Sequence, residues 1–311
     1  MAIESCLCCL SLNIKTLPAA DGFEHSACLC CGYEHFSRAD HCATSSLYEQ
    51  DLDYSADLDV CSDAADLLQW QHHVALKMIA TMKKLNPDLH VFDVGCFNGF
   101  FVRTLIDRGV DAFGIDFNNV AVQYGQDRYM LKDRVICGDV DSILALGNKY
   151  EVITLFELLE HLEDPSSFLK TIGQILSDNG HVVMSVPNKK MIWRPKLDNP
   201  PHHLSRFTRK SLQCLLEGAG FTSVTIHEQM NLYNLIRNYI GSLLRSKHHI
   251  TLRGGELPRW KVILFVKRCL NKLRRSAYLI MYPLDKVLYF LGIRYISMVA
   301  VAHKISDTKA L

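Results

Sequence analysis

The sequence predicts an α/β protein built on a doubly wound parallel sheet. Short apolar runs alternate with helix-like stretches through the middle of the 311-residue chain, and the connections between them are short, as such a sheet requires. The first run, 90–92, leads into a turn that contains Gly95 and Gly99 and opens a helix. Because glycines let a backbone come close to a ligand, this turn marks the expected binding edge of the sheet.

The remaining elements follow in order along the chain. The later runs expected to form strands are 112–115, 134–140, 150–156, 181–186, 222–226 and 295–304. Helical patterns lie at 67–85, after Asn118, at 166–176 and at 208–218. Pro165 suits the first turn of the helix at 166–176, because proline is favoured there.

The chemistry of the turn favours one class of adenosine-containing cofactor. A dinucleotide fingerprint reads G-x-G-x-x-G, because a pyrophosphate must sit on the helix N-terminus. Here Asp93 directly follows the run 90–92. An acid there repels a pyrophosphate and suits the cationic amino group of a methionine moiety. The turn therefore favours S-adenosylmethionine over a nicotinamide dinucleotide, although a purely structural strand-to-helix turn stays open on this motif alone.

Three segments resemble motifs of the class I S-adenosylmethionine-dependent methyltransferases. The turn resembles the family's D-x-G-x-G-x-G motif, with Phe97 where a glycine is usual. Residues 157–165 resemble its E-x-L-E-H-x-x-D-P signature, and 201–208 resemble P-x-H-x-x-x-F-(S/T). The resemblance covers nearly all of 70–230 and the last strand. It is closest to bacterial enzymes related to ubiquinone-pathway O-methyltransferases and to those encoded with polysaccharide genes. It implies a seven-stranded Rossmann-like methyltransferase sheet.

The resemblance also implies the residues that hold the cofactor. Asp116, after the second strand, would accept hydrogen bonds from the ribose hydroxyls, and Asp139 would lie beside the adenine. The full expected set is Asp93, Gly95, Cys96, Phe97, Gly99, Asp116, Phe117, Asp139, Val140, Phe156 and Glu157.

Methyl transfer to a hydroxyl or an acidic carbon usually needs a base, and histidine is the natural choice. The candidates are His203, His161 and His202. His203 matches the family's histidine best, and Pro200 and Pro201 restrict its loop. The alternative is that these histidines cap helices or bond to backbone. A base with the ordinary histidine pKa of about 6.5 would lose activity below that pH.

The amino-terminal cysteines have the spacing of a structural zinc site. Two C-x-x-C pairs are separated by 18 residues, within the range of such sites. The expected ligands are Cys6, Cys9, Cys28 and Cys31. Four thiolates satisfy zinc and leave no open position, so the metal would be structural and would supply folding energy. Cys8 and Cys30 offer other pairings, and unliganded reduced thiols are the alternative reading.

A basic insertion separates the last two expected strands. Residues 231–294 carry thirteen Lys or Arg and two acids, whereas the chain as a whole has a net charge of +1. Apolar residues recur between the bases, which is typical of a basic amphipathic helix. A peripheral membrane contact, a partner site and a solvated cap are the three readings. Nucleic acid is not expected, because no base-reading motif accompanies the charge.

We therefore expect five regions and an S-adenosylmethionine-dependent enzyme. The regions are a zinc-knuckle segment at 1–45, a linker and cover helix at 46–88, the methyltransferase core at 89–230, the helical insertion at 231–293 and the final strand and tail at 294–311. The expected acceptor is a small molecule, such as a nucleotide-linked or lipid-linked sugar. With no signal peptide and no long apolar run, we expect a cytoplasmic protein, peripheral on the inner membrane surface if the insertion contacts lipid. The alternative is an inactive methyltransferase-fold scaffold that binds zinc and a partner or membrane surface.

Overall fold

The structure is a computed structural model. It describes residues 4–20, 22–37, 69–191, 194, 198–228, 232, 236, 251–252, 255–256, 280–288, 290–292 and 297–304. The expected linker upstream of residue 69 and most of the expected insertion lie outside the described residues.

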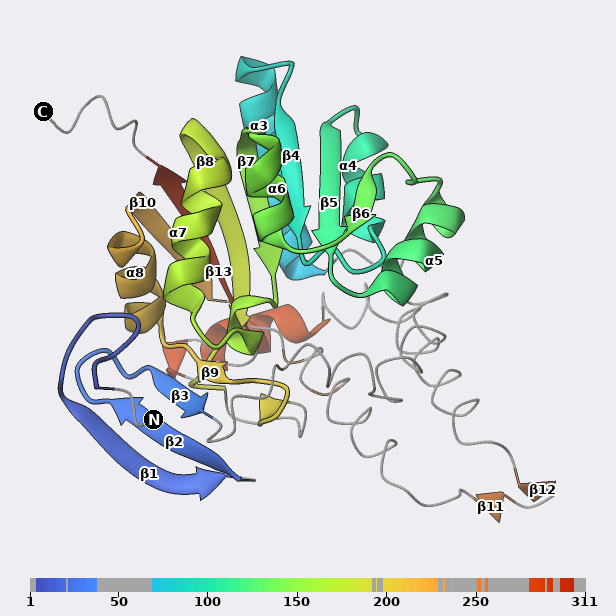
Figure 1. The fold of residues 1–311 in the computed structure, drawn as a ribbon. Coiled ribbons are helices and arrows are strands. Elements are labelled where there is room, and N and C mark those ends of the chain that lie inside the picture. Colours follow the sequence, from blue (N-terminus) through green and yellow to red (C-terminus); the bar gives the residue numbers. More distant parts are fainter. Residues whose placement is uncertain are drawn as a thin grey trace, which may run out of the picture.

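A seven-stranded sheet forms the centre of the described part (Figure 1), in the order β10-β13-β8-β7-β4-β5-β6. Its strands are β4 (His90–Val94), β5 (Asp111–Asp116), β6 (Val135–Cys137), β7 (Tyr150–Phe156), β8 (Leu176–Pro187), β10 (Phe221–Glu228) and β13 (Ser297–Lys304). The five strands from β6 to β8 are parallel, whereas β13 pairs antiparallel with both β8 and β10. The predicted seven-stranded fold is confirmed.

Helices cover both faces of this sheet, as a doubly wound fold requires. The helices are α3 (Trp70–Leu85), α4 (Phe100–Ile106), α5 (Asn119–Tyr129), α6 (Val140–Leu146), α7 (Pro165–Ile175) and α8 (Arg209–Gly218). One buried cluster joins α7 and α8 to the sheet, and a second joins α3, α4 and α5 to the opposite face (Figure 1). The predicted cover helix at 67–85 is α3, and it packs Ala75 and Ile79 into the second cluster.

Two strands depart from their expected bounds by three residues or more. β6 ends at Cys137, three residues before the expected end, because Asp139 caps α6: its carboxylate accepts a hydrogen bond from the backbone N–H of Ser142 at 3.0 Å. β8 begins at Leu176, five residues before the expected start. A side chain that caps a helix competes with continuation of the preceding strand, and the pattern of apolar residues does not reveal this competition.

The amino-terminal segment forms a small antiparallel sheet, which the cysteine spacing did not predict. Its strands are β1 (Ile14–Ala20), β2 (Phe23–Cys28), β3 (Glu34–Ser37) and β9 (Ser205–Arg206), in that order. The fourth strand comes from the distant part of the chain that carries His203 (Figure 1). Buried cysteines of this segment share one core with Phe207 and α8, so the segment packs onto the methyltransferase core.

The expected insertion is described only in short pieces. β11 (Thr251–Leu252) pairs with β12 (Gly255–Glu256), and residues 280–288 are helical. Within the described residues, no helix is long and apolar enough to cross a membrane.

Candidate functional site

The glycine turn between β4 and α4 lies at the carboxyl edge of the parallel strands, where ligands bind in such sheets. Gly95, Phe97 and Gly99 have φ of 75°, 51° and 71°, all in the left-handed region that glycine adopts most easily. Phe97 therefore takes the backbone conformation that the family's usual glycine would take there. The departure at Phe97 is compatible with the shape of the turn.

Side chains and backbone of neighbouring elements pack closely against the turn. A Cβ at Gly99 would lie 2.8 Å from the side chain of Val135, and one at Gly125 of α5 would lie 1.8 Å from the carbonyl oxygen of Asn98. Helix α5 therefore rests directly on the backbone of the turn.

Asp93 is the penultimate residue of β4, so its expected place one residue past the strand was wrong. Its side chain is buried and accepts a hydrogen bond from the hydroxyl of Thr154 at 2.6 Å. Burial raises the pKa of Asp93 to about 7, because a low-polarity surrounding disfavours the charged carboxylate. The side chain of Asp93 lies inside the sheet, where its hydrogen bond to Thr154 of the neighbouring strand β7 satisfies one carboxyl oxygen.

Asp116 closes β5 and braces the turn from the neighbouring strand. One of its oxygens accepts the backbone N–H of Phe97 at 2.7 Å, and the other accepts the N–H of Asn118 at 2.9 Å. Burial raises the pKa of this carboxyl. Each carboxylate oxygen can accept more than one hydrogen bond, so the expected contact with ribose hydroxyls stays a prediction.

The other expected cofactor residues surround the same edge. Cys96 and Val140 are buried, Phe117 is exposed, and Asp139 is the exposed cap of α6. The ring of Phe156 meets that of Phe101 edge-on at 5.1 Å.

Two side chains at this edge were missed by the sequence analysis. The hydroxyl of Ser185 donates to the carboxylate of Glu157 at 2.7 Å, and burial raises the pKa of Glu157 to about 7. His72 of α3 stacks on Phe101 and meets Phe156 edge-on, both at 4.9 Å. The sequence signal for His72 was its place in the predicted cover helix, among the apolar residues that pack on the sheet.

Two of the three candidate histidines lie together. The rings of His161 and His203 meet edge-to-face with centroids 4.6 Å apart. Nδ1 of His161 donates to the carbonyl oxygen of His202 at 2.7 Å. His161 therefore makes the backbone hydrogen bond that is expected if its role is structural. Among these contacts His202 contributes only its backbone. The short 3-10 helix η1 (Leu159–His161) places His161 beside the loop 198–204.

His203 is oriented by an acid that the sequence analysis missed. Its Nδ1 donates to Oδ1 of buried Asp198 at 2.7 Å, and Arg194 pairs with the other oxygen of the same carboxylate. This arrangement leaves Nε2 as the acceptor of the neutral ring. An acid five residues before the histidine was the only available signal.

Burial sets the pKa of both histidines. It lowers the pKa of His203 and of His161 to about 3, and the nearby charge of Arg194 acts in the same direction on His203. The expectation of an ordinary histidine pKa was therefore wrong, because both rings are largely shielded from water. Both imidazoles are neutral at physiological pH.

Glu160 lies beside the two histidines. It is 1% exposed, and neither carboxylate oxygen has a hydrogen-bond partner among the described residues. Burial raises the pKa of Glu160 well above the usual range. Glu160, His161 and His203 present donor or acceptor atoms within 4.8 Å of one another, a set that a proton or a small cation could bridge.

The four predicted metal ligands come together in the amino-terminal sheet. The sulfur atoms of Cys6, Cys9, Cys28 and Cys31 all lie within 4.8 Å of one another. Cys6 and Cys31 are 3.5 Å apart and Cys9 and Cys28 are 3.6 Å apart. Tetrahedral zinc with Zn–S bonds of about 2.3 Å separates its sulfurs by about 3.8 Å. The backbone N–H of Cys31 points at the sulfur of Cys28, and Gly32 has φ of 78°, so the cluster fits a zinc knuckle and the outer pairing is the one formed.

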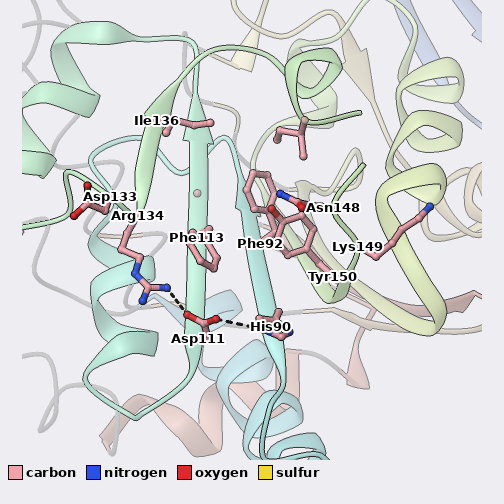
Figure 2. A pocket seen from close by; sticks show the side chains of 12 residues that line it. His90, Phe92, Asp111, Phe113, Asp133, Arg134, Ile136, Asn148, Lys149 and Tyr150 are labelled. Atoms are coloured by element: carbon pink, nitrogen blue, oxygen red, sulfur yellow. Dashed lines mark hydrogen bonds and ion pairs between the residues drawn. The ribbon is translucent and has the colours of Figure 1, made fainter. Parts of the chain in front are cut away.

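A cavity of about 370 Å³ lies elsewhere (Figure 2). It is lined by His90 and Tyr150, the first residues of β4 and β7, so it opens at the amino ends of the strands. Asp111 pairs there with both Arg134 and His90. This cavity contains none of the expected site residues.

Comparisons with known proteins agree with this architecture. A model of a methyltransferase domain family matches residues 68–226, just over half of the chain. A ubiquinone biosynthesis O-methyltransferase of Coxiella burnetii is 26% identical over 103 residues, covering 32% of this chain and 44% of the relative. A probable S-adenosylmethionine-dependent methyltransferase of Mycolicibacterium smegmatis is 27% identical over 162 residues, covering 50% of this chain and 62% of the relative. The chain thus matches less than two thirds of the length of these relatives.

Solved structures agree on the fold. A phosphoethanolamine N-methyltransferase of Haemonchus contortus in complex with S-adenosylhomocysteine aligns with a TM-score of 0.58 and 10% identity, covering 94% of this chain and 72% of that one. A plantazolicin methyltransferase aligns with a TM-score of 0.52 and 12% identity, covering 85% of this chain and 94% of that one. The family match covers the glycine turn, most of the sheet and the histidine loop, and the chain belongs to the methyltransferase domain family.

Proposed function

We propose that the chain transfers the methyl group of S-adenosylmethionine to an oxygen or carbon atom of a small-molecule acceptor. One observation carries the proposal: a histidine paired with a buried aspartate stands in the loop that matches the family's histidine motif, within the fold whose glycine turn would hold the cofactor. When bound, the cofactor supplies an electrophilic methyl group on a sulfonium, so the protein needs mainly to position the acceptor and accept its proton.

The residues present fit the cofactor. Gly95 and Gly99 have no Cβ, so the backbone of the turn can come close to a ligand. The space at Gly95 is narrow, because a Cβ there would lie 3.3 Å from the side chain of Leu158. Two buried carboxyl groups adjoin the turn: Asp93 stands two residues before Gly95 in β4, and Asp116 accepts the backbone N–H of Phe97. Asp93 would attract the amino group of the methionine moiety, and Asp116 would bind the ribose while it braces Phe97.

His203 would act as the base. Its Nδ1–H bond to Asp198 keeps Nε2 open for the acceptor's proton, and the Asp198 carboxylate would stabilise the imidazolium that forms. The lowered pKa of His203 keeps the ring neutral at pH values near neutrality but also makes it a weaker base. The Asp198 carboxylate would have to offset this by stabilising the imidazolium when the acceptor is bound. His161 would shape the loop through its bond to the His202 backbone.

The acceptor we propose is a nucleotide-linked or lipid-linked sugar of polysaccharide biosynthesis. The support is the sequence resemblance to methyltransferases encoded with polysaccharide genes. The test is transfer of a labelled methyl group from S-adenosylmethionine to a panel of nucleotide sugars and polyprenyl-linked sugars. His203→Gln serves as the control that should bind cofactor and transfer little. Transfer to small phenols with none to sugars would reject this acceptor class.

We propose zinc as the metal of the four-cysteine cluster. Its support is the thiolate donor set at the separations that tetrahedral zinc imposes. Metal analysis of protein purified without chelators should give about one zinc per chain. Iron in its place, or no metal, would reject the assignment.

We also propose that the basic insertion contacts the cytoplasmic face of a membrane. In the helix at 280–288 the acid Asp285 is 4% exposed and accepts the N–H of Leu232, whereas Ile280 is 78% exposed. The other exposed apolar side chains nearby are Tyr282, Leu284, Val287, Phe290 and Leu291. An outward apolar face in a segment of net positive charge suits an anionic lipid surface. Flotation with vesicles containing phosphatidylglycerol should retain the wild type and lose Phe290→Asp. Equal binding of both proteins would reject this contact.

An inactive scaffold is the second candidate, and Phe97 favours it, because its side chain stands at a place in the turn where the resembled family usually has glycine. A scaffold would bind zinc without binding S-adenosylmethionine. Cofactor binding together with methyl transfer would exclude it.

A further inference from the structure

The cysteine sheet is joined to the histidine loop by backbone pairing. β3 pairs with β9, with Glu34 opposite Arg206. The N–H of Phe36 donates to the carbonyl oxygen of Leu204 at 2.8 Å, and the N–H of Leu204 donates to that of Glu160 at 2.7 Å. The residue directly after His203 is thus held by backbone hydrogen bonds between the amino-terminal sheet and the segment that carries His161.

A chain of polar side chains runs along the same junction. Glu34 is 12% exposed and pairs with Lys189 at 3.0 Å and with Arg206 at 3.2 Å. Arg206 also donates to the side-chain oxygen of Asn199 at 2.7 Å. The backbone oxygen of Asn199 in turn accepts the N–H of His203 at 3.3 Å. A carboxylate of the cysteine sheet is therefore three hydrogen bonds away from the backbone of His203.

The cysteine turn that contains Cys28 and Cys31 anchors the other side of the loop. The hydroxyl of Thr208 donates to the carbonyl oxygen of Cys31 at 2.7 Å, and Lys189 donates to that of Gly32 at 2.9 Å. Any metal that fixes the turn also fixes these carbonyl oxygens. The cluster and the Glu34 pairs thus act on the loop together.

We propose that the four-cysteine sheet positions the base of the reaction, with Glu34 as the positioning residue that acts on His203 through Arg206 and Asn199. The proposal rests on the proposed role of His203. Glu34 touches neither cofactor nor acceptor in this assignment. Its partially buried pairs are worth more than surface ion pairs because solvent screens them less.

A spectroscopic signature of His203 tests the proposal without a known acceptor. The groups that face this ring are Asp198, His161, His202, Arg194, Arg206 and Glu160. In full-length protein labelled with ¹⁵N-histidine, His203 should show the neutral form with its proton on Nδ1. His203→Gln assigns the signal. Glu34→Gln should broaden or shift it toward a mixture of tautomers, because the loop no longer holds Nδ1 against Asp198.

Matched variants separate positioning from folding. Glu24→Gln, an exposed change on β2 of the same sheet, should leave the His203 signal unchanged. Arg206→Lys should restore part of what Arg206→Ala loses, since the charge opposite Glu34 returns. Asn199→Ala, which keeps the Glu34 pairs, should reproduce the effect of Glu34→Gln and serves if that variant does not fold.

S-adenosylhomocysteine binding, measured on the same samples, distinguishes the two proposals. Binding by wild type and by Glu34→Gln within about twofold, with an altered His203 signal, supports positioning. An unchanged His203 signal in folded Glu34→Gln or Asn199→Ala overturns it. No binding by the wild type overturns the proposed function and leaves the His203 result to decide the coupling on its own.

Discussion

At the scale of single residues, the histidine loop shows how burial changes the chemistry of a motif. His203 was found by its motif, but Asp198, which orients it, was not, because an acid five residues away has no fixed relation to a histidine in a loop. Its pKa could not be predicted either, since burial in the folded loop sets it. A motif names a side chain, and the fold decides its charge.

Replacing His203 by alanine should lower turnover by about 10²–10⁴, the usual contribution of a general base. The affinity for S-adenosylhomocysteine should stay within about twofold, because a base acts in the transition state. His161→Ala should have a smaller effect. Full turnover in a folded His203→Ala protein would move the base elsewhere.

The pH dependence should differ from that of an exposed histidine. Folding lowers the pKa of His203 and His161 to about 3, against about 6.5 in an unfolded chain. Their contribution to stability is therefore fully present above pH 6.5 and is lost as the pH falls from about 6.5 toward 3, because the unfolded chain then binds more protons. Unfolding by urea at a series of pH values should show this loss, and it should shrink in the His161→Gln, His203→Gln double variant. An undiminished loss would contradict the assignment.

Asp116→Ala should weaken S-adenosylmethionine binding by about 1.5–3 kcal/mol, the range for hydrogen bonds to a charged group. The matched control is Asp133→Ala, an exposed change away from the turn. Calorimetric titration measures both. Equal affinities of the wild type and folded Asp116→Ala would remove Asp116 from the cofactor site.

At the scale of elements, packing decides where a substitution is tolerated. Glycine to alanine inside a helix normally stabilises by about 1 kcal/mol. Gly125→Ala should instead destabilise, because its Cβ would lie 1.8 Å from the backbone oxygen of Asn98. Gly173→Ala in α7 meets nothing closer than 4.0 Å and should stabilise. Thermal unfolding measures the stability change of each variant. The two changes should have opposite signs, and equal signs would contradict the packing argument.

The sequence predicted the strands and helices of the core because alternating apolar runs are local signals. It also predicted which four cysteines cluster, since their spacing is local within each pair. The pairing of β3 with β9 was beyond reach, because Glu34 and Arg206 lie far apart in the chain and β9 has only two residues. The burial of Asp93 likewise depends on Thr154 of another strand.

At the scale of the whole molecule, the amino-terminal segment and the sheet domain share one core. Cys28→Ser should release the metal. Because Cys28 is buried in the same cluster as Phe207 and α8, the loss should also lower the unfolding temperature of the whole chain. The control is Cys30→Ser, a change at an exposed cysteine. This variant should keep the metal and the unfolding temperature of the wild type. Metal loss with an unchanged unfolding temperature would mean that the segment folds as a separate unit.

The most direct test of the central claim is calorimetric titration of the full-length protein with S-adenosylmethionine. We expect one molecule to bind per chain, and we expect Gly95→Val to abolish binding while the protein stays folded, because the added side chain would fill the cradle beside Leu158. NADH should give no heat. No heat with S-adenosylmethionine, or unchanged affinity in Gly95→Val, would contradict the assignment of the glycine turn as the cofactor site.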